Sequence, residues 1–139
     1  MMITTPYASL ASAQEKDITV TVEAIDTTRP GQIMAMLFAE DGFPKDHAKA
    51  LSTQTQNVVL GAKTMRFRFT VENDNFAIKI LHDEDITGEV SKNWTGIIPS
   101  EGLGFSNGAR LRFGPPSYKD AVLKTDEVGD AITISIIYP

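Results

Sequence analysis

The sequence predicts an all-β protein: an antiparallel β-sandwich of about seven strands, with one short helix and one long loop. Apolar and polar residues alternate in several short segments, as they do in strands that bury one face. Turn residues separate these segments, which is typical of immunoglobulin-like or prealbumin-like sandwiches. Strands do not alternate with long helices, which argues against a parallel α/β sheet, and a small barrel is the alternative.

The first two predicted strands flank a proline–glycine turn. Residues 17–25 alternate, with Ile18 and Val20 on the buried face. Residues 28–31 read Thr-Arg-Pro-Gly, in which proline fixes φ and glycine permits a positive φ. Residues 32–39 are almost wholly apolar, so we expect a strand covered on both faces, with a buried helical segment as the alternative.

The middle of the chain predicts the short helix and the next strands. Residues 43–51 favour a helix, because Pro44 suits a first helical turn and alanine and leucine follow. We expect strands at residues 57–60, 64–71 and 76–82, with an Asn-Asp-Asn turn between the last two.

The last part of the chain predicts short strands around a rigid corner. We expect strands at residues 109–113, 121–125 and 131–138. Between the first two, Phe-Gly-Pro-Pro-Ser-Tyr at residues 113–118 forms the corner, because its two prolines fix φ.

Length and composition limit the classes of protein that the chain can represent. Its 139 residues fit a single sandwich domain at residues 17–139. The absence of cysteine excludes disulfides and thiolate metal sites, and the formal net charge of −5 argues against nucleic-acid binding. No apolar run is long enough to span a membrane.

The N-terminal residues 1–16 predict either a flexible tail or the remnant of a signal peptide. Ala11-Ser12-Ala13 has the small-residue pattern of a secretory cleavage site. A basic region and an apolar stretch before it are missing, so a complete signal would need a start upstream of Met1. A periplasmic or secreted location is therefore the expectation, with the cytoplasm as the alternative.

Residues 82–107 show no periodicity and form the unusual long loop. Connections of this length without secondary structure are uncommon in compact domains and often carry function. The loop contains the only tryptophan, Trp94. Its five acidic residues and one lysine leave four of the five net negative charges of the chain here.

The start of this loop resembles the opening of a calcium-binding loop. Hard cations prefer clustered oxygen ligands, and Gly88 allows the sharp turn that brings such ligands together. Trp94 occupies the place of the usual bidentate glutamate, so a standard EF-hand is excluded. A solvated acidic turn is the alternative. The candidate Ca²⁺ ligands are Asp83, Asp85, Thr87, Glu89, Ser91 and Glu101.

A hydrolase is a second hypothesis. Residues 104–108 match G-x-S-x-G around Ser106, and His82 beside Asp83 could act as a base. The nucleophile elbow needs a strand before it, a helix after it and a histidine later in the chain. This sequence meets none of these conditions, so we favour a tight turn and assign no catalytic residue.

Two arginine pairs suggest a third hypothesis, a carrier of a small anionic ligand. Arg66 with Arg68 and Arg110 with Arg112 each fall on one face of a predicted strand. If the two strands were neighbours, four guanidinium groups would form an anion-binding patch. A solvated face is the alternative. His82, Trp94 and these four arginines are the candidate binding residues.

Several short motifs stand in and around the long loop: His82-Asp83, Glu101-Gly102, residues 104–107 and the Phe-Gly-Pro-Pro segment at residues 113–116. With these motifs the region resembles a bacterial family known as domain of unknown function 2141. The resemblance implies a small exported β-sandwich protein without an assigned activity. Members often carry asparagines and a final aspartate where this chain has Asp85, Thr87 and Ser91, which weakens a metal site here.

These observations together predict a non-enzymatic binding or interaction module. Its partner would be a protein or a small molecule, and Ca²⁺ would be its one candidate cofactor.

Overall fold

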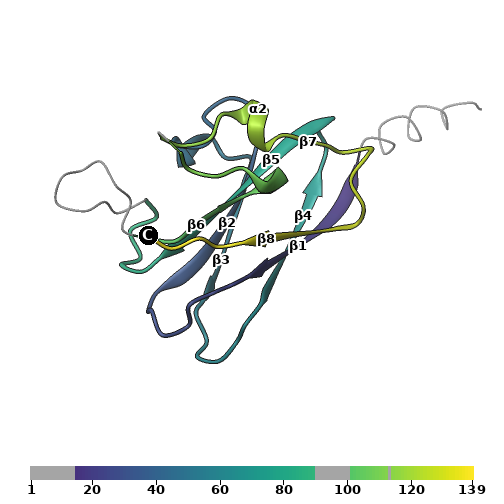
Figure 1. Cartoon of the computed structure of the whole chain (residues 1–139). Helices are drawn as coiled ribbons and strands as arrows, with labels where there is room; N and C mark the ends of the chain where they lie inside the picture. The colour runs from purple at the N-terminus through teal and green to yellow at the C-terminus, as the bar shows by residue number, and fades with distance from the viewer. Residues whose placement is uncertain (1–14, 90–100, 113) are drawn as a thin grey trace, which may run out of the picture.

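Two β-sheets packed face to face form the protein in a computed structural model, which describes residues 15–89, 101–112 and 114–139 (Figure 1). The first sheet has the strand order β4-β1-β8, and the second has the order β3-β2-β5-β6, with β7 paired to the start of β5. The predicted all-β sandwich is therefore confirmed. The strands are β1 (Lys16–Glu23), β2 (Gln32–Phe38), β3 (Ser52–Asn57), β4 (Met65–Val71), β5 (Asn75–Asp83), β6 (Leu103–Phe105), β7 (Leu123–Lys124) and β8 (Ala131–Ser135).

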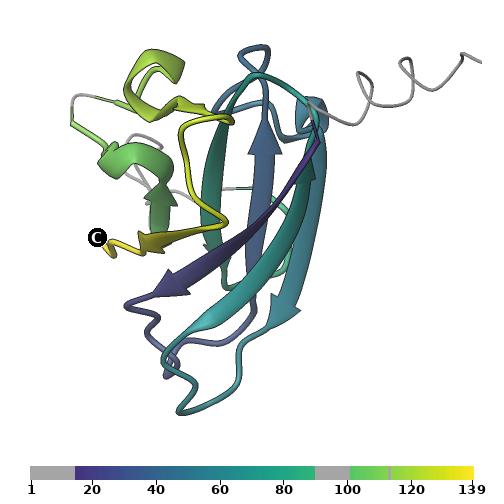
Figure 2. The same ribbon diagram turned by 90° about the vertical axis from the view of Figure 1, so that its right-hand side faces the viewer.

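Pairing is antiparallel throughout these sheets except between β1 and β8, which run parallel. Figure 2 shows the sheet that contains β1 in front of the second sheet. The helices of the described residues are short: η1 (His47–Lys49), η2 (Ser106–Gly108) and α2 (Tyr118–Ala121). None of them is long and apolar enough to cross a membrane.

The main core lies between the sheets and follows the alternation in the sequence. On β4, buried and exposed residues alternate strictly. Phe67 and Phe69 therefore lie inside, and Arg66 and Arg68 lie outside. Both faces of β2 and β5 are buried, because a second apolar cluster covers the outer face of their sheet. That second cluster contains Met34, Met36, Phe38, Leu81, Leu103 and Phe105.

Polar contacts join the two sheets along both sides. On one side, the amide Nε2 atoms of Gln54 and Gln56 on β3 donate to the backbone carbonyls of Arg68 and Arg66 on β4. On the other side, Leu103 and Ile137 exchange two backbone hydrogen bonds of 3.0 and 2.9 Å. These contacts satisfy backbone groups that strand edges would otherwise leave unpaired.

Several predicted elements differ from the observed ones. The strand expected at residues 57–60 is wrong, because β3 lies just before it and consists of polar residues. Residues 109–112 form no strand, whereas β6 lies inside the predicted loop. The helix expected at residues 43–51 is only the single turn η1, and the corner after Pro116 contains the unpredicted helix α2.

The turn before β2 generates the first prediction. Gly31 has a φ of +100°, and a Cβ atom there would lie 2.2 Å from the backbone oxygen of Asp83. Gly31→Ala should therefore lower the free energy of unfolding by roughly 2–4 kcal/mol, from backbone strain plus overlap. Gly61 has a φ of +88° and open space around it, so Gly61→Ala should cost only about 1–2 kcal/mol. Urea denaturation of both variants measures the difference, and equal losses would contradict the prediction.

Candidate functional site

Asp83 ends β5 and begins the acidic loop with a fully buried carboxylate. Its Oδ2 atom accepts hydrogen bonds from the Gln32 side chain at 3.0 Å and from the Gly88 amide at 2.7 Å. Its Oδ1 atom accepts one from the Thr87 amide at 3.1 Å. These hydrogen bonds replace the hydration of the buried group and fold the loop start back on itself.

Three carboxylates converge at this point from two limbs of the chain. Asp83, Asp85 and Glu101 each bring one oxygen atom within 4.8 Å of the others. Glu101 is buried, and its Oε2 atom accepts a hydrogen bond from the Glu84 amide at 2.6 Å, which ties the far limb to the near one. Oxygen ligands of one Ca²⁺ ion, each at 2.3–2.6 Å from the metal, lie no more than about 5 Å apart. The cluster therefore has the dimensions of a calcium site.

Two more predicted ligands lie beside this cluster. The Thr87 hydroxyl lies 3.1 Å from Asp85 Oδ1 and 3.0 Å from the carbonyl oxygen of Glu89. The Glu89 side chain itself is exposed and points toward His47, with 3.6 Å between Oε2 and Nδ1. Ser91 and Trp94, the remaining predictions on this loop, fall outside the described residues.

His82 is completely buried, and both of its ring nitrogens are bonded. Nε2 lies 2.9 Å from the carbonyl of Pro30 and Nδ1 lies 2.7 Å from the Tyr138 hydroxyl. Because a carbonyl only accepts, Nε2 carries the proton, and Nδ1 accepts from the hydroxyl. That hydroxyl in turn accepts from the Asp26 amide at 2.9 Å. The histidine thus joins the proline–glycine turn to the C-terminal segment.

Arg29 clamps the same turn to the acidic loop. Its guanidinium group forms ion pairs of 2.9 Å with Glu84 and 3.2 Å with Asp26. It also lies over the Tyr138 ring, 4.6 Å from the centroid, in a cation–π arrangement. The hydrogen bond to Glu84 is the largest contribution that raises the pKa of Arg29, and burial raises the pKa of the Tyr138 phenol.

A buried lysine holds the loop from the opposite face of β5. Lys79 is only 3% exposed, and its Nζ atom donates to the Pro44 carbonyl at 2.8 Å and to His47 Nε2 at 2.9 Å. His47 Nδ1 then donates to the Gly88 carbonyl at 2.7 Å. Burial lowers the pKa of Lys79 to about 8, although the nearby Glu89 carboxylate acts in the opposite direction.

Ser106 lies in the core at the start of η2 and is bonded on both sides. Its hydroxyl donates to the Ala121 carbonyl at 2.6 Å and accepts from the Ile78 amide at 2.9 Å. Since the only proton of this hydroxyl goes to a backbone carbonyl, the structure does not pair Ser106 with a histidine base. The expected tight turn is present, with Asn107 at a φ of 57°.

The arginine pairs do not occupy neighbouring strands. Arg66 and Arg68 lie on the exposed face of β4, opposite Thr21 and Thr19 of β1. Arg110 and Arg112 are exposed in the irregular segment after η2. The predicted strand that would have brought all four together is therefore wrong.

Several residues that hold the loop in place were not among the predicted site residues. Lys79 was detectable as a single charge within the apolar run of β5, which predicts a buried lysine with a defined partner. Gln32, Arg29, His47 and Tyr138 carried no comparable signal, because their partners lie 32 to 56 residues away along the chain.

The buried lysine generates a prediction about pH. The unfolded chain keeps Lys79 protonated up to its ordinary pKa of 10.5, whereas the folded protein releases the proton near 8. The unfolded state then binds more protons between these values, so the free energy of unfolding should rise by about 2 kcal/mol from pH ~7.5 to ~9.5. Urea denaturation should show this rise in the wild type and in Lys124→Met, which removes an exposed lysine, but not in Lys79→Met. An unchanged slope in Lys79→Met would contradict this assignment.

No curated protein and no solved structure matches the chain. One family model matches residues 20–133, from within β1 to within β8, and its description is "Uncharacterized protein conserved in bacteria (DUF2141)". The match covers well over half of the sequence and includes the acidic loop and the carboxylate cluster. The chain therefore belongs to the bacterial DUF2141 family, as its sequence motifs predict.

Proposed function

We propose that the protein is a non-enzymatic interaction module whose acidic loop is stabilised by Ca²⁺. The observation that carries the proposal is the convergence of Asp83, Asp85 and Glu101 within 4.8 Å. These residues come from both ends of the long loop, so one ion bound among them would cross-link its two limbs. Family membership leaves the activity open, since the family itself is described as uncharacterised.

The chemistry of the cluster favours a hard divalent cation. Carboxylate oxygens at this separation repel one another, and two of the three belong to buried side chains. A bound Ca²⁺ would relieve this repulsion. The Thr87 hydroxyl beside Asp85 and the Glu89 carbonyl beside Thr87 would supply further neutral oxygens. A neutral threonine in place of a carboxylate reduces the charge of the site, so we expect weak binding, roughly 10⁻⁴–10⁻³ M as in extracellular modules.

The bonding of His82 and Ser106 supports a non-enzymatic role over the hydrolase alternative. A general base and a nucleophile need groups that are free to meet a substrate. His82 is 0% exposed and Ser106 is 1% exposed, and each is bonded to backbone or phenol groups of the fold. Both side chains are better explained as parts of the scaffold.

An exported location is part of the same proposal. It is supported by the resemblance of residues 11–13 to a secretory cleavage site. Millimolar calcium outside the cytoplasm would fill a weak site. Expression of the gene with its upstream codons, followed by cell fractionation, should place the product in the periplasm or the medium. Recovery only in the cytoplasm would contradict export.

Thermal unfolding tests the calcium site. Calcium at about 100 times the dissociation constant should stabilise the folded protein by about 2.7 kcal/mol, which corresponds to a rise in Tm of roughly 5–10 °C. EDTA should reverse this rise. Asp85→Asn should abolish it without unfolding the protein, because Asp85 is the exposed member of the cluster.

Asp126→Asn is the matched control, since Asp126 is an exposed aspartate in the turn after β7. This variant should keep the full calcium response. An unchanged Tm in the wild type at millimolar calcium, together with no bound metal in native mass spectrometry, would refute the calcium part of the proposal.

A further inference from the structure

We propose that the cleft between β6 and β8 binds an extended peptide segment of a partner protein, which adds as a strand to β8 and places an acidic group on Arg110. The cleft has a volume of 480 Å³, within the range of ligand-binding pockets. This inference names a partner class for the proposed interaction module, and it depends on that module and not on the calcium site.

The cleft exists because two strands that meet at one point then separate. Leu103 and Ile137 form an isolated bridge, in which the backbone N–H of each residue donates to the carbonyl of the other. Beyond this bridge β6 continues only to Phe105 and then turns into η2. The next antiparallel rung, between Phe105 and Ser135, is not formed.

The open edge of β8 therefore presents backbone groups without a strand partner. The backbone N–H of Ile136 donates to the Glu23 carbonyl, and the backbone carbonyl of Asp130 accepts from the Thr19 N–H. The backbone groups of the even-numbered residues in and beside β8 therefore pair with β1. The backbone groups of Thr133 and Ser135 alternate with these and point away from β1, on the same side as those of Ile137. The Ser135 carbonyl lies against Gly104 of β6, 2.8 Å from the place of a Cβ atom on that glycine, so the edge opens into the cleft at Thr133. Among the described residues no strand pairs with them, and such an edge is a template for strand addition.

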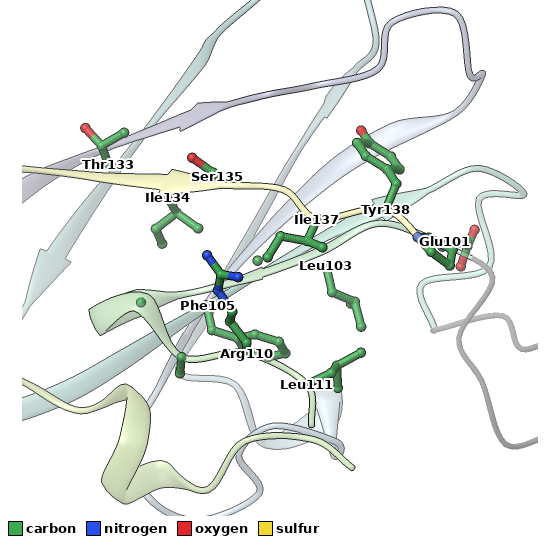
Figure 3. Close-up of a pocket in the computed structure, with 14 residues that line it drawn as sticks. Glu101, Leu103, Phe105, Arg110, Leu111, Thr133, Ile134, Ser135, Ile137 and Tyr138 are labelled. Atoms are coloured by element: carbon green, nitrogen blue, oxygen red, sulfur yellow. The ribbon is translucent and has the colours of Figure 1, made fainter. Parts of the chain in front are cut away.

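Apolar side chains and one cation surround this edge. Figure 3 shows Ile134 projecting from β8 toward the side of the strand on which Leu103, Phe105 and Leu111 lie. Leu111 and Ile137 are 38% and 49% exposed and both line this cleft, so they add apolar surface to its walls. Alternate apolar side chains of an added strand would cover them.

Arg110 determines the charge of the occupant. Its guanidinium group lies between β8 and the end of β6 (Figure 3), and no described carboxylate forms an ion pair with it. An exposed guanidinium beside apolar surface suits a carboxylate, which it can bind through two hydrogen bonds. A strand with alternating apolar residues and one aspartate, glutamate or C-terminal carboxylate satisfies the backbone edge, the apolar walls and the arginine together.

Selection from a phage-displayed library of random heptapeptides tests the proposal. We expect enrichment of peptides that alternate apolar residues and contain an acidic group. A fluorescein-labelled synthetic copy of an enriched peptide should bind in a polarisation assay, equally with calcium and with EDTA. Arg110→Gln should weaken binding about tenfold or more, whereas Arg66→Gln on the exposed face of β4 should not change it.

Backbone pairing is tested from both sides. Thr133→Pro removes an N–H group that faces the cleft and not β1, so the fold should tolerate it while peptide affinity falls at least about fivefold. A peptide with N-methyl groups on alternate amides should lose measurable binding to the wild type, and this measurement does not depend on how the Thr133 variant folds.

Three results would overturn the inference. The first is no enrichment of peptides by the wild type, and the second is binding that neither Arg110→Gln nor N-methylation weakens. The third is a different occupant of the cleft. This would be a fatty acid, shown by binding of dodecanoate without any peptide, or a second copy of the chain, shown by a concentration-dependent dimer that Arg110→Gln dissociates. If calcium stabilises the fold but no peptide binds, this inference fails while the calcium site of the proposed function stands.

Discussion

The buried carboxylate of Asp83 is the constraint on which the loop end of the molecule depends. A buried polar group without contact to water is costly unless hydrogen bonds replace its hydration, and here Gln32, Thr87 and Gly88 supply them. Gln32 is also the register partner of Asp83, so the bonds that satisfy the carboxylate fix the pairing of β2 with β5. The backbone of the same residue requires Gly31 to lack a side chain, because the turn before β2 lies against the Asp83 carbonyl. One aspartate thus couples strand register, turn conformation and loop shape.

Side chains on both faces of β5 hold the beginning of the acidic loop, because successive residues of a strand point to opposite faces. On the inner side, His82 connects Pro30 to Tyr138, and Arg29 lies over the Tyr138 ring. On the outer side, Lys79 reaches Gly88 through His47. Each set of contacts joins segments that are distant in sequence. Opening the loop start would therefore break contacts of the folded core. Buried polar networks of this kind give a fold a defined geometry only when every member has a partner, and among the described residues no buried side-chain nitrogen or oxygen lacks one.

The sequence predicts the role of a residue where that role depends on its neighbours along the chain, and not where it depends on distant segments. The alternation in β1 and β4 predicts their faces, because burial of one side imposes a period of two. β3 escaped detection because its Ser-Thr-Gln-Thr-Gln-Asn sequence has no apolar face, and its glutamines cap β4 carbonyls through contacts that no local pattern encodes. The spacing of Asp83 and Asp85 predicts their proximity, whereas the approach of Glu101 depends on β6 pairing with β5. His82 is a scaffold residue only because Tyr138 and Pro30 reach it.

The carboxylate cluster and the cleft share residues, and this has a thermodynamic consequence. Glu101 belongs to the cluster and lines the cleft, and Tyr138 lines the cleft while its hydroxyl bonds to His82 beside Asp83. The Leu103–Ile137 bridge stands between the two regions and fixes the point where β6 and β8 diverge. If an ion at the cluster alters the position of Glu101, it alters one wall of the cleft, and any resulting change in peptide affinity must equal the change in metal affinity that the peptide produces. Equal affinity with and without calcium would then mean that the coupling free energy between the two sites is zero and that the position of Glu101 is the same in both states.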